Sequence, residues 1–151
     1  MATVEQTMMK VQRILTGPMG LKVMLEADRF RVTFNDSSTF VQIKVNEWGT
    51  DKEGQPRTVI SVSAPILREV KPTPELFEWV AREGSDRLFG HVEVHDFTEP
   101  GTVHLVFRHT LLGDYVDEPE LSTALFGVLS VADRWDDELQ ERFGGKRWTD
   151  A

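Results

Sequence analysis

The chain has 151 residues, no cysteine, 40% hydrophobic residues and a formal net charge of −8 at pH 7, which favours one folded domain over residues 1–151. The missing cysteines exclude disulfides and thiolate metal sites and fit the cytoplasm, and no apolar run approaches the roughly 20 residues that span a membrane. The negative charge argues against unspecific binding of nucleic acid, which depends on clustered lysine and arginine side chains.

The first half of the chain reads as one helix followed by three strands. Apolar residues at helical spacing predict a helix from about Val4 that ends at Gly17-Pro18. Residues 20–28 fit either a helical turn or an irregular segment, and residues 51–55 form a polar loop of hairpin length. Pro65 lies inside the third strand and predicts an edge position or a bulge. Apolar and polar residues alternate over the three predicted strands, which are 30–34, 40–45 and 60–66.

The second half reads as helix, hairpin and long helix. Thr73-Pro74 combines a capping hydroxyl with a proline at the first helical position, and that helix is expected to end at Gly84. Asp117 begins a capping box for a last helix of about 25 residues, which Gly144-Gly145 closes. The two hairpin strands are expected over 88–97 and 103–112.

This order predicts an α+β fold with a mostly antiparallel five-stranded sheet, in the sequence α-β-β-β-α-β-β-α. Short polar connections favour antiparallel neighbours, and the alternating strands imply one packed and one wetter sheet face. The first and last helices each carry one apolar stripe and are expected to cover the packed face.

All four histidines lie between His91 and His109, in the predicted hairpin. His91, Glu93 and His95 share one strand face, whereas His109 falls on the apolar face and is expected in the core. A four-residue turn would give the register Phe97–Thr102, His95–His104 and His91–Arg108.

His91, His95 and His104 are the candidates for a metal site. Because the spacing of a zinc signature is missing, an exposed polar sheet face without metal or cofactor is the favoured interpretation.

No residue pattern predicts catalysis. A Gly-x-Ser-x-Gly nucleophile motif is missing, and the glycine pair closes a helix rather than opening a phosphate loop. Five acidic residues near the end of the chain are interpreted as a solvated helix face, because exposed carboxylates lack the environments that split pKa values. They are Asp133, Asp136, Asp137, Glu138 and Glu141. We therefore expect no enzyme.

The helix after Thr73 is apolar on nearly every side, which predicts burial on more than one side. One side is expected to face the sheet, and the other a second subunit, a bound segment, or another part of the same chain. If Trp79 faces a subunit, Trp79→Asp should dissociate a dimer; if it lies in the core, the buried charge should destabilise the fold. The candidate interface residues are Leu76, Trp79, Val80 and Phe126.

The run ADRWDDELQERFGG over residues 132–145, with Leu111-Leu112-Gly113-Asp114 before it, resembles the YbjN-like branch of the type III secretion chaperone superfamily. The order of elements, the size and the acidic balance resemble the same fold over nearly the whole chain. The resemblance implies a bacterial protein without catalytic residues, a homodimer, and an extended stretch of a partner protein as the client.

The resemblance thus leads to a non-catalytic, chaperone-like module that holds a segment of a protein or peptide client. The alternative is a regulator of the sensory transduction type that binds a folded partner. A metal-binding protein that uses the hairpin histidines is a third hypothesis.

Overall fold

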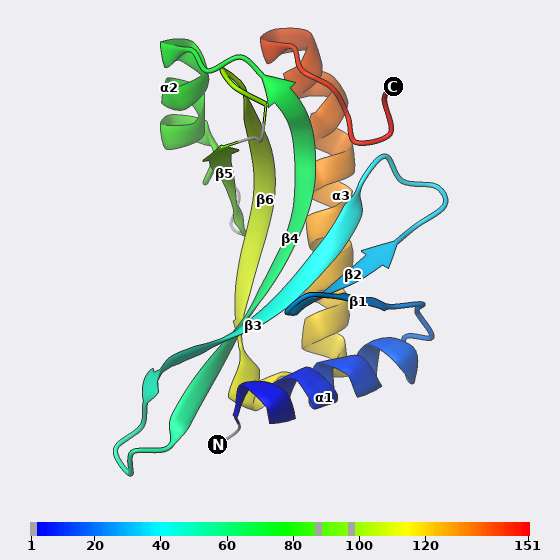
Figure 1. The fold of residues 1–151 in the computed structure, drawn as a ribbon, viewed down its shortest axis with the longest axis vertical. Helices are drawn as coiled ribbons and strands as arrows, with labels where there is room; N and C mark the ends of the chain where they lie inside the picture. Colours follow the sequence, from blue (N-terminus) through cyan, green and yellow to red (C-terminus); the bar gives the residue numbers. More distant parts are fainter. Residues whose placement is uncertain (1–2, 87–88, 97–98) are drawn as a thin grey trace.

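The computed structural model describes residues 3–86, 89–96 and 99–151. Helices α1 and α3 lie on one face of an antiparallel sheet, and α2 lies beside the edge strand β5 (Figure 1). The elements are α1 Val4–Thr16, β1 Met24–Glu26, β2 Arg29–Thr33, β3 Phe40–Thr50, β4 Pro56–Val70, α2 Pro74–Glu83, β5 His91–Asp96, β6 Val103–Leu112, the 3-10 helix η1 Gly113–Tyr115 and α3 Glu118–Phe143.

Over the residues that the structure describes, the sheet has six strands in the order β1-β2-β3-β4-β6-β5, and every neighbouring pair is antiparallel. The α+β class and the predicted order of elements are therefore confirmed, with six strands instead of five. The extra strand, β1, comes from the ambiguous segment 20–28 and pairs with β2. Within the described residues, no helix is both long and apolar enough to cross a bilayer.

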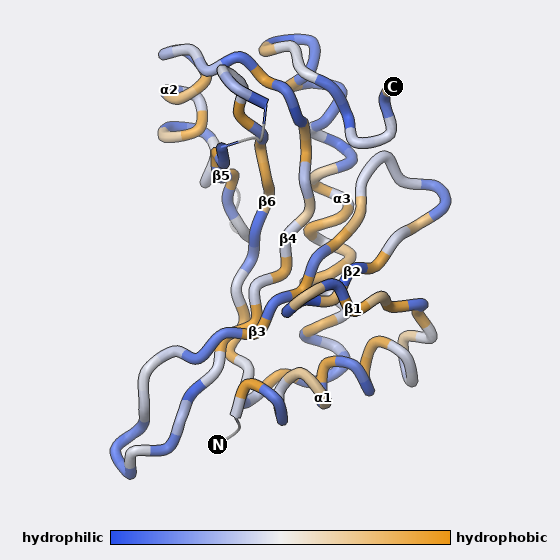
Figure 2. Tube along the Cα trace, viewed as in Figure 1, coloured by the Kyte–Doolittle hydropathy of each residue, from blue (hydrophilic) through white to orange (hydrophobic). Residues whose placement is uncertain are grey.

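The core lies between the sheet and the inner sides of α1 and α3. Alternate residues of β3, β4 and β6 point into it, including Ile43, Val62 and Phe107, each fully buried. Full burial of one such side chain contributes about 1.5–3 kcal/mol. In Figure 2 the apolar residues follow this inner layer. The predicted stripe of α3 supplies Leu121, Leu125, Val128, Ala132, Trp135 and Leu139, all buried.

The predicted helix ends are confirmed by their hydrogen bonds. The Thr73 hydroxyl accepts from the Leu76 amide at 3.2 Å, and the Asp117 carboxylate accepts from the Glu120 amide at 2.9 Å. Gly144 ends α3 at φ 76°, a backbone region that favours glycine.

Pro65 lies in a central strand of the sheet. Of the two alternatives predicted for it, the edge position is therefore wrong and the bulge is confirmed. β4 pairs with β3 on one side and β6 on the other, and its register with β6 shifts between Pro65 and Leu67. The pairing with β3 ends at Ser63, so the proline ring removes no donor from that ladder.

The ends of β3 and β4 project from the body as a two-stranded arm, residues 47–57 (Figure 1). Register pairs of β6 with β4 begin at Val59, and those of β2 with β3 end at Lys44. The two strands of the arm therefore pair with each other alone among the described residues. Figure 2 shows that the arm is largely hydrophilic.

Candidate partner-binding surface

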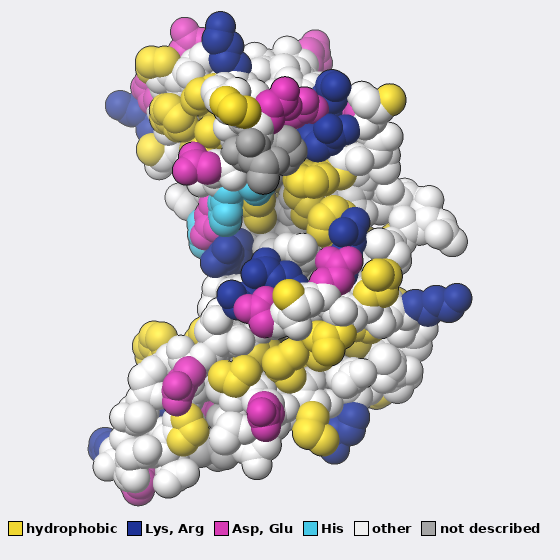
Figure 3. Space-filling model, viewed as in Figure 1, with side chains coloured by type: hydrophobic (Ala, Val, Ile, Leu, Met, Phe, Trp, Pro, Cys, Tyr) yellow, Lys and Arg dark blue, Asp and Glu magenta, His cyan; other side chains and the backbone are white. Residues whose placement is uncertain are grey.

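His91 and His95 lie on the open face of the sheet, on either side of one carboxylate. Glu93 accepts from the Nε2 atoms of His91 and His95, both at 2.8 Å, and lies 3.1 Å from the Arg108 guanidinium. Burial, the largest influence, raises the pKa of Glu93, but the histidine hydrogen bonds and the Arg108 charge together lower it below its usual value. Figure 3 shows histidine side chains at the waist of the molecule, beside basic and acidic side chains.

The predicted register of the hairpin is confirmed for His95–His104 and His91–Arg108. The predicted Phe97–Thr102 pair includes Phe97, which lies outside the described residues. In the part of the chain that the structure describes, no three His, Asp or Glu side chains are grouped to hold a metal ion.

His109 is half-buried and stacks on Phe89, with ring centroids 4.0 Å apart. Burial, with a smaller contribution from His91, lowers the pKa of His109. The residue therefore faces the packed side, as its parity predicts, but lies at the margin of the core and not within it.

The acidic residues of α3 do not form one solvated face. Asp137, Glu138 and Glu141 are exposed, but Asp136 is only 2% exposed, because the turn before β3 covers it. The Ser38 hydroxyl donates to Asp136, and Asp133 accepts from the Ser37 hydroxyl at 2.7 Å and from the Ser38 amide at 3.2 Å. The interpretation as a solvated face was wrong for Asp133 and Asp136, whose carboxylates fasten that turn to α3. The sequence pattern of α3 alone could not reveal this, because the covering serines lie about 100 residues away.

Leu76 and Trp79 face the core of their own chain. Leu76 is fully buried, and the Trp79 ring lies 5.4 Å from that of Trp135 and 6.0 Å from that of Phe143. On the outer side of α2, Phe77 is 46% exposed. Of the four interface candidates, Leu76 and Trp79 are thus covered within the chain.

Val80 is half-buried at the margin of the same helix. Phe126 is 45% exposed and contacts Phe34 at a ring distance of 6.0 Å. It precedes Trp135 by two and a half helical turns, and therefore lies on the opposite side of α3 from the α2 contact. Phe126 does not extend the surface of α2.

Exposed apolar side chains gather instead at the end of the molecule around η1. Trp48 of the arm, Leu112 at the end of β6 and Tyr115 of η1 are 56%, 54% and 67% exposed. Large exposed apolar groups that share one region are typical of interaction sites. Of these three residues, Leu112 belongs to the Leu111-Leu112-Gly113-Asp114 motif, whereas Trp48 and Tyr115 carry no signal in the sequence pattern.

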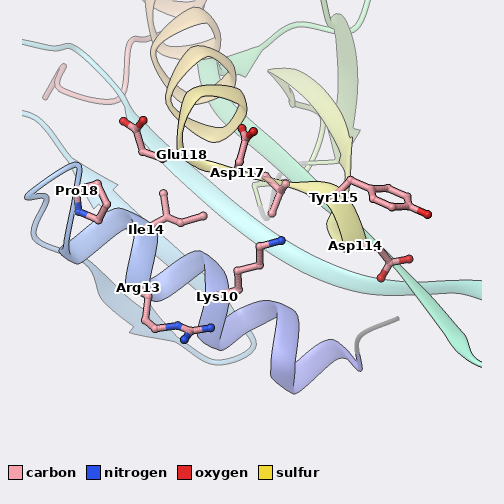
Figure 4. Close-up of a pocket in the computed structure, with 9 residues that line it drawn as sticks. Lys10, Arg13, Ile14, Pro18, Asp114, Tyr115, Asp117 and Glu118 are labelled. Atoms are coloured by element: carbon pink, nitrogen blue, oxygen red, sulfur yellow. The ribbon is translucent and has the colours of Figure 1, made fainter.

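A groove of about 650 Å³ lies between α1 and the segment that connects β6 to α3 (Figure 4). Lys10 and Ile14 extend from α1 toward that segment in the view of Figure 4. One wall carries basic and the other acidic side chains. This η1 groove is lined by Lys10, Arg13, Ile14, Pro18, Asp114, Tyr115, Val116, Asp117 and Glu118.

A second hollow, of about 270 Å³, lies where the arm leaves the body. Asp114 and Tyr115 line both hollows, which therefore adjoin at η1. We call this second hollow the arm pocket. Its lining residues are Trp48, Arg57, Thr58, Leu112, Asp114 and Tyr115.

Gly113 allows η1 to pack closely on the base of this surface. A Cβ atom there would lie 2.2 Å from the Thr58 hydroxyl oxygen and 3.0 Å from a Thr7 methyl carbon. The Thr7 and Thr58 hydroxyl oxygens are 2.9 Å apart in a buried hydrogen bond. The glycine of the Leu111-Leu112-Gly113-Asp114 motif thus lets Asp114 and Tyr115 reach both hollows.

The comparisons with known proteins agree with this architecture. Residues 5–151 match the family model TY-Chap1, described as "T3SS (YopN, CesT) and YbjN peptide-binding chaperone 1". The chain belongs to the TY-Chap1 family. The resemblance to YbjN and the secretion chaperones is thereby confirmed. No curated protein matches the chain.

Among solved structures, this TY-Chap1 protein is similar to YbjN from E. coli, described as a candidate transcription regulator. The match has a TM-score of 0.60 and covers 90% of this chain and 93% of the other, at 11% sequence identity. At that identity, the likeness shows the fold.

Proposed function

We propose that this TY-Chap1 protein is a non-catalytic, chaperone-like module that holds an extended segment of a partner protein in the η1 groove. The observation that carries the proposal is the cluster of exposed Trp48, Leu112 and Tyr115 beside that groove. Burial of apolar surface drives such association, and aromatic side chains supply much of it at interfaces. The family description, peptide-binding chaperone, supports the same assignment.

The wider proposal includes a bacterial, cytoplasmic homodimer. The absence of cysteine fits a reducing compartment, and the resemblance to secretion chaperones supports a dimer. Since Leu76 and Trp79 are covered within the chain, the outer side of α2, with Phe77 and Val80, is the part of that helix that a second subunit would contact.

The test is binding to reduced, carboxymethylated α-lactalbumin, which is permanently unfolded, compared with the native form of the same protein. We expect binding to the unfolded form alone, weakened about tenfold or more by Tyr115→Ala, because Tyr115 borders both hollows. Phe126→Ala is the matched control, an exposed aromatic residue on α3 and away from both hollows. Fluorescence anisotropy of the labelled target gives the dissociation constants.

Equal loss in both variants, or no binding to the unfolded form, would contradict the proposal.

The second candidate function is a regulator that binds a folded partner, which the description of YbjN favours. That function predicts no affinity for the unfolded form.

A further inference from the structure

We propose that the arm pocket is an anchor site for one large, uncharged apolar side chain of the bound segment. This inference rests on the proposed function and specifies its partner: a segment whose affinity depends on a residue such as leucine or phenylalanine at one position.

The described lining of the arm pocket comes from β3, β4, β6 and η1. Trp48 belongs to the arm, Leu112 ends β6 and Tyr115 belongs to η1. Each side chain is more than half exposed although its neighbours form a concave surface of about 270 Å³. A water molecule occupies about 30 Å³ in the liquid, so the pocket has room for several waters or one large side chain. Concave sites with mainly apolar walls and few polar groups are typical of specific binding.

The charges of the arm pocket select against a charged occupant. Among the described residues that line it, Arg57 and Asp114 are the charged ones, and their charges are opposite. A charged occupant of either sign would be attracted by one of these groups and repelled by the other, so the two charges give little net attraction to offset its desolvation. An apolar side chain has no charge to desolvate, and the Arg57 guanidinium can donate to backbone carbonyl groups of the same segment.

The arm pocket adjoins the η1 groove at Asp114 and Tyr115. Because Asp114 and Tyr115 line both hollows, a segment that follows the groove can continue into the adjoining arm pocket. An extended chain advances about 3.3 Å per residue and turns alternate side chains to one side. A few residues along the groove therefore suffice to bring one side chain to the arm pocket.

The experiment uses overlapping 13-residue peptides of α-lactalbumin and takes the tightest binder. Each of its large apolar residues is replaced in turn by Ala, Lys or Glu, and each peptide is titrated against the full chain and against Trp48→Ala. At one peptide position, we expect replacement by Ala to weaken binding about tenfold in the full chain and less than twofold in Trp48→Ala. Leu112→Ala serves as a second pocket variant, and Phe126→Ala, exposed on α3, as the control.

Arg57→Gln tests the charge argument separately. Arg57→Gln leaves Asp114 as the charged residue among the described part of the lining, so a peptide with Lys at the anchor position should gain at least fivefold in affinity relative to the unchanged protein. A peptide with Glu there should gain nothing.

The inference is overturned if Trp48→Ala weakens all peptides by one common factor, or if it weakens none. In both cases Tyr115→Ala can still reduce binding, and then the groove function survives without the anchor site. If neither the unfolded protein nor its peptides bind, both proposals fail together.

Discussion

At the scale of single residues, Asp136 shows how far an environment can depart from a sequence pattern. Its burial is the main cause of a raised pKa, which the neighbouring charges of Asp137 and Asp133 raise further, against the Ser38 hydrogen bond that lowers it. The charged form of this carboxylate is therefore disfavoured in the folded protein. Asp136 accepts a hydrogen bond from the Ser38 hydroxyl and so holds the turn before β3 against α3.

Asp136→Asn should make the protein at least as stable as the original at neutral pH. The Asp136 carboxyl has a pKa near 3.8 in the unfolded state and a higher pKa in the folded state, so the folded state binds its proton more tightly. The free energy of unfolding therefore falls as pH rises from the unfolded pKa through the folded pKa. Asparagine cannot ionise, yet its carbonyl oxygen can still accept from Ser38. Urea unfolding between pH 4 and 8 should show the difference growing in favour of the variant and then levelling off.

The control is Glu138→Gln on the exposed side of α3, which should show no such pH dependence. A variant that is less stable by one constant amount at every pH would contradict the interpretation.

At the scale of elements, α2 is apolar on both sides for two different reasons. Trp79 packs edge-on against Trp135 and joins α2 to the end of α3. Phe77 on the outer side is 46% exposed and contributes little to the core. The helical pattern indicated two covered sides but could not tell which of them the same chain covers.

Trp79→Asp and Phe77→Asp should therefore separate the core from the dimer interface. Trp79→Asp should lower the free energy of unfolding by about 3–5 kcal/mol, because it removes a packed aromatic ring and buries a charge. Phe77→Asp should change that free energy by less than about 0.5 kcal/mol but convert the predicted dimer to a monomer. Urea unfolding and light scattering measure the two effects. An unchanged mass for Phe77→Asp would remove this side of α2 as the interface.

At the scale of the whole molecule, the sequence predicts what depends on nearby residues. Periodicity and turn length gave the order of elements, the α+β class and the His95–His104 register, because all of these are set locally. β1 was missed because three residues are too few to show an alternating pattern. The segment is a strand because it pairs with β2, which its own sequence does not reveal. The arm pocket was missed because Trp48, Leu112 and Tyr115 come together only through the pairing of β3 with β4, the pairing of β4 with β6, and the turn of η1.

The arm has a consequence for how stability is distributed over the molecule. An isolated two-stranded ribbon is marginally stable in water, so the arm should open locally without unfolding the body. Its strand amides, such as those between residues 47 and 50, should exchange with deuterium at least about a hundredfold faster than those of β6. Hydrogen-exchange mass spectrometry measures both rates, and equal protection would contradict this view.

A partner held by Trp48 would also restrict the arm, and the same amides should then exchange more slowly. Part of the binding free energy would be spent on this ordering, which lowers the affinity for a given contact area. A disulfide or shorter loop that stiffens the arm without touching the arm pocket should therefore tighten binding mainly through a smaller entropic cost.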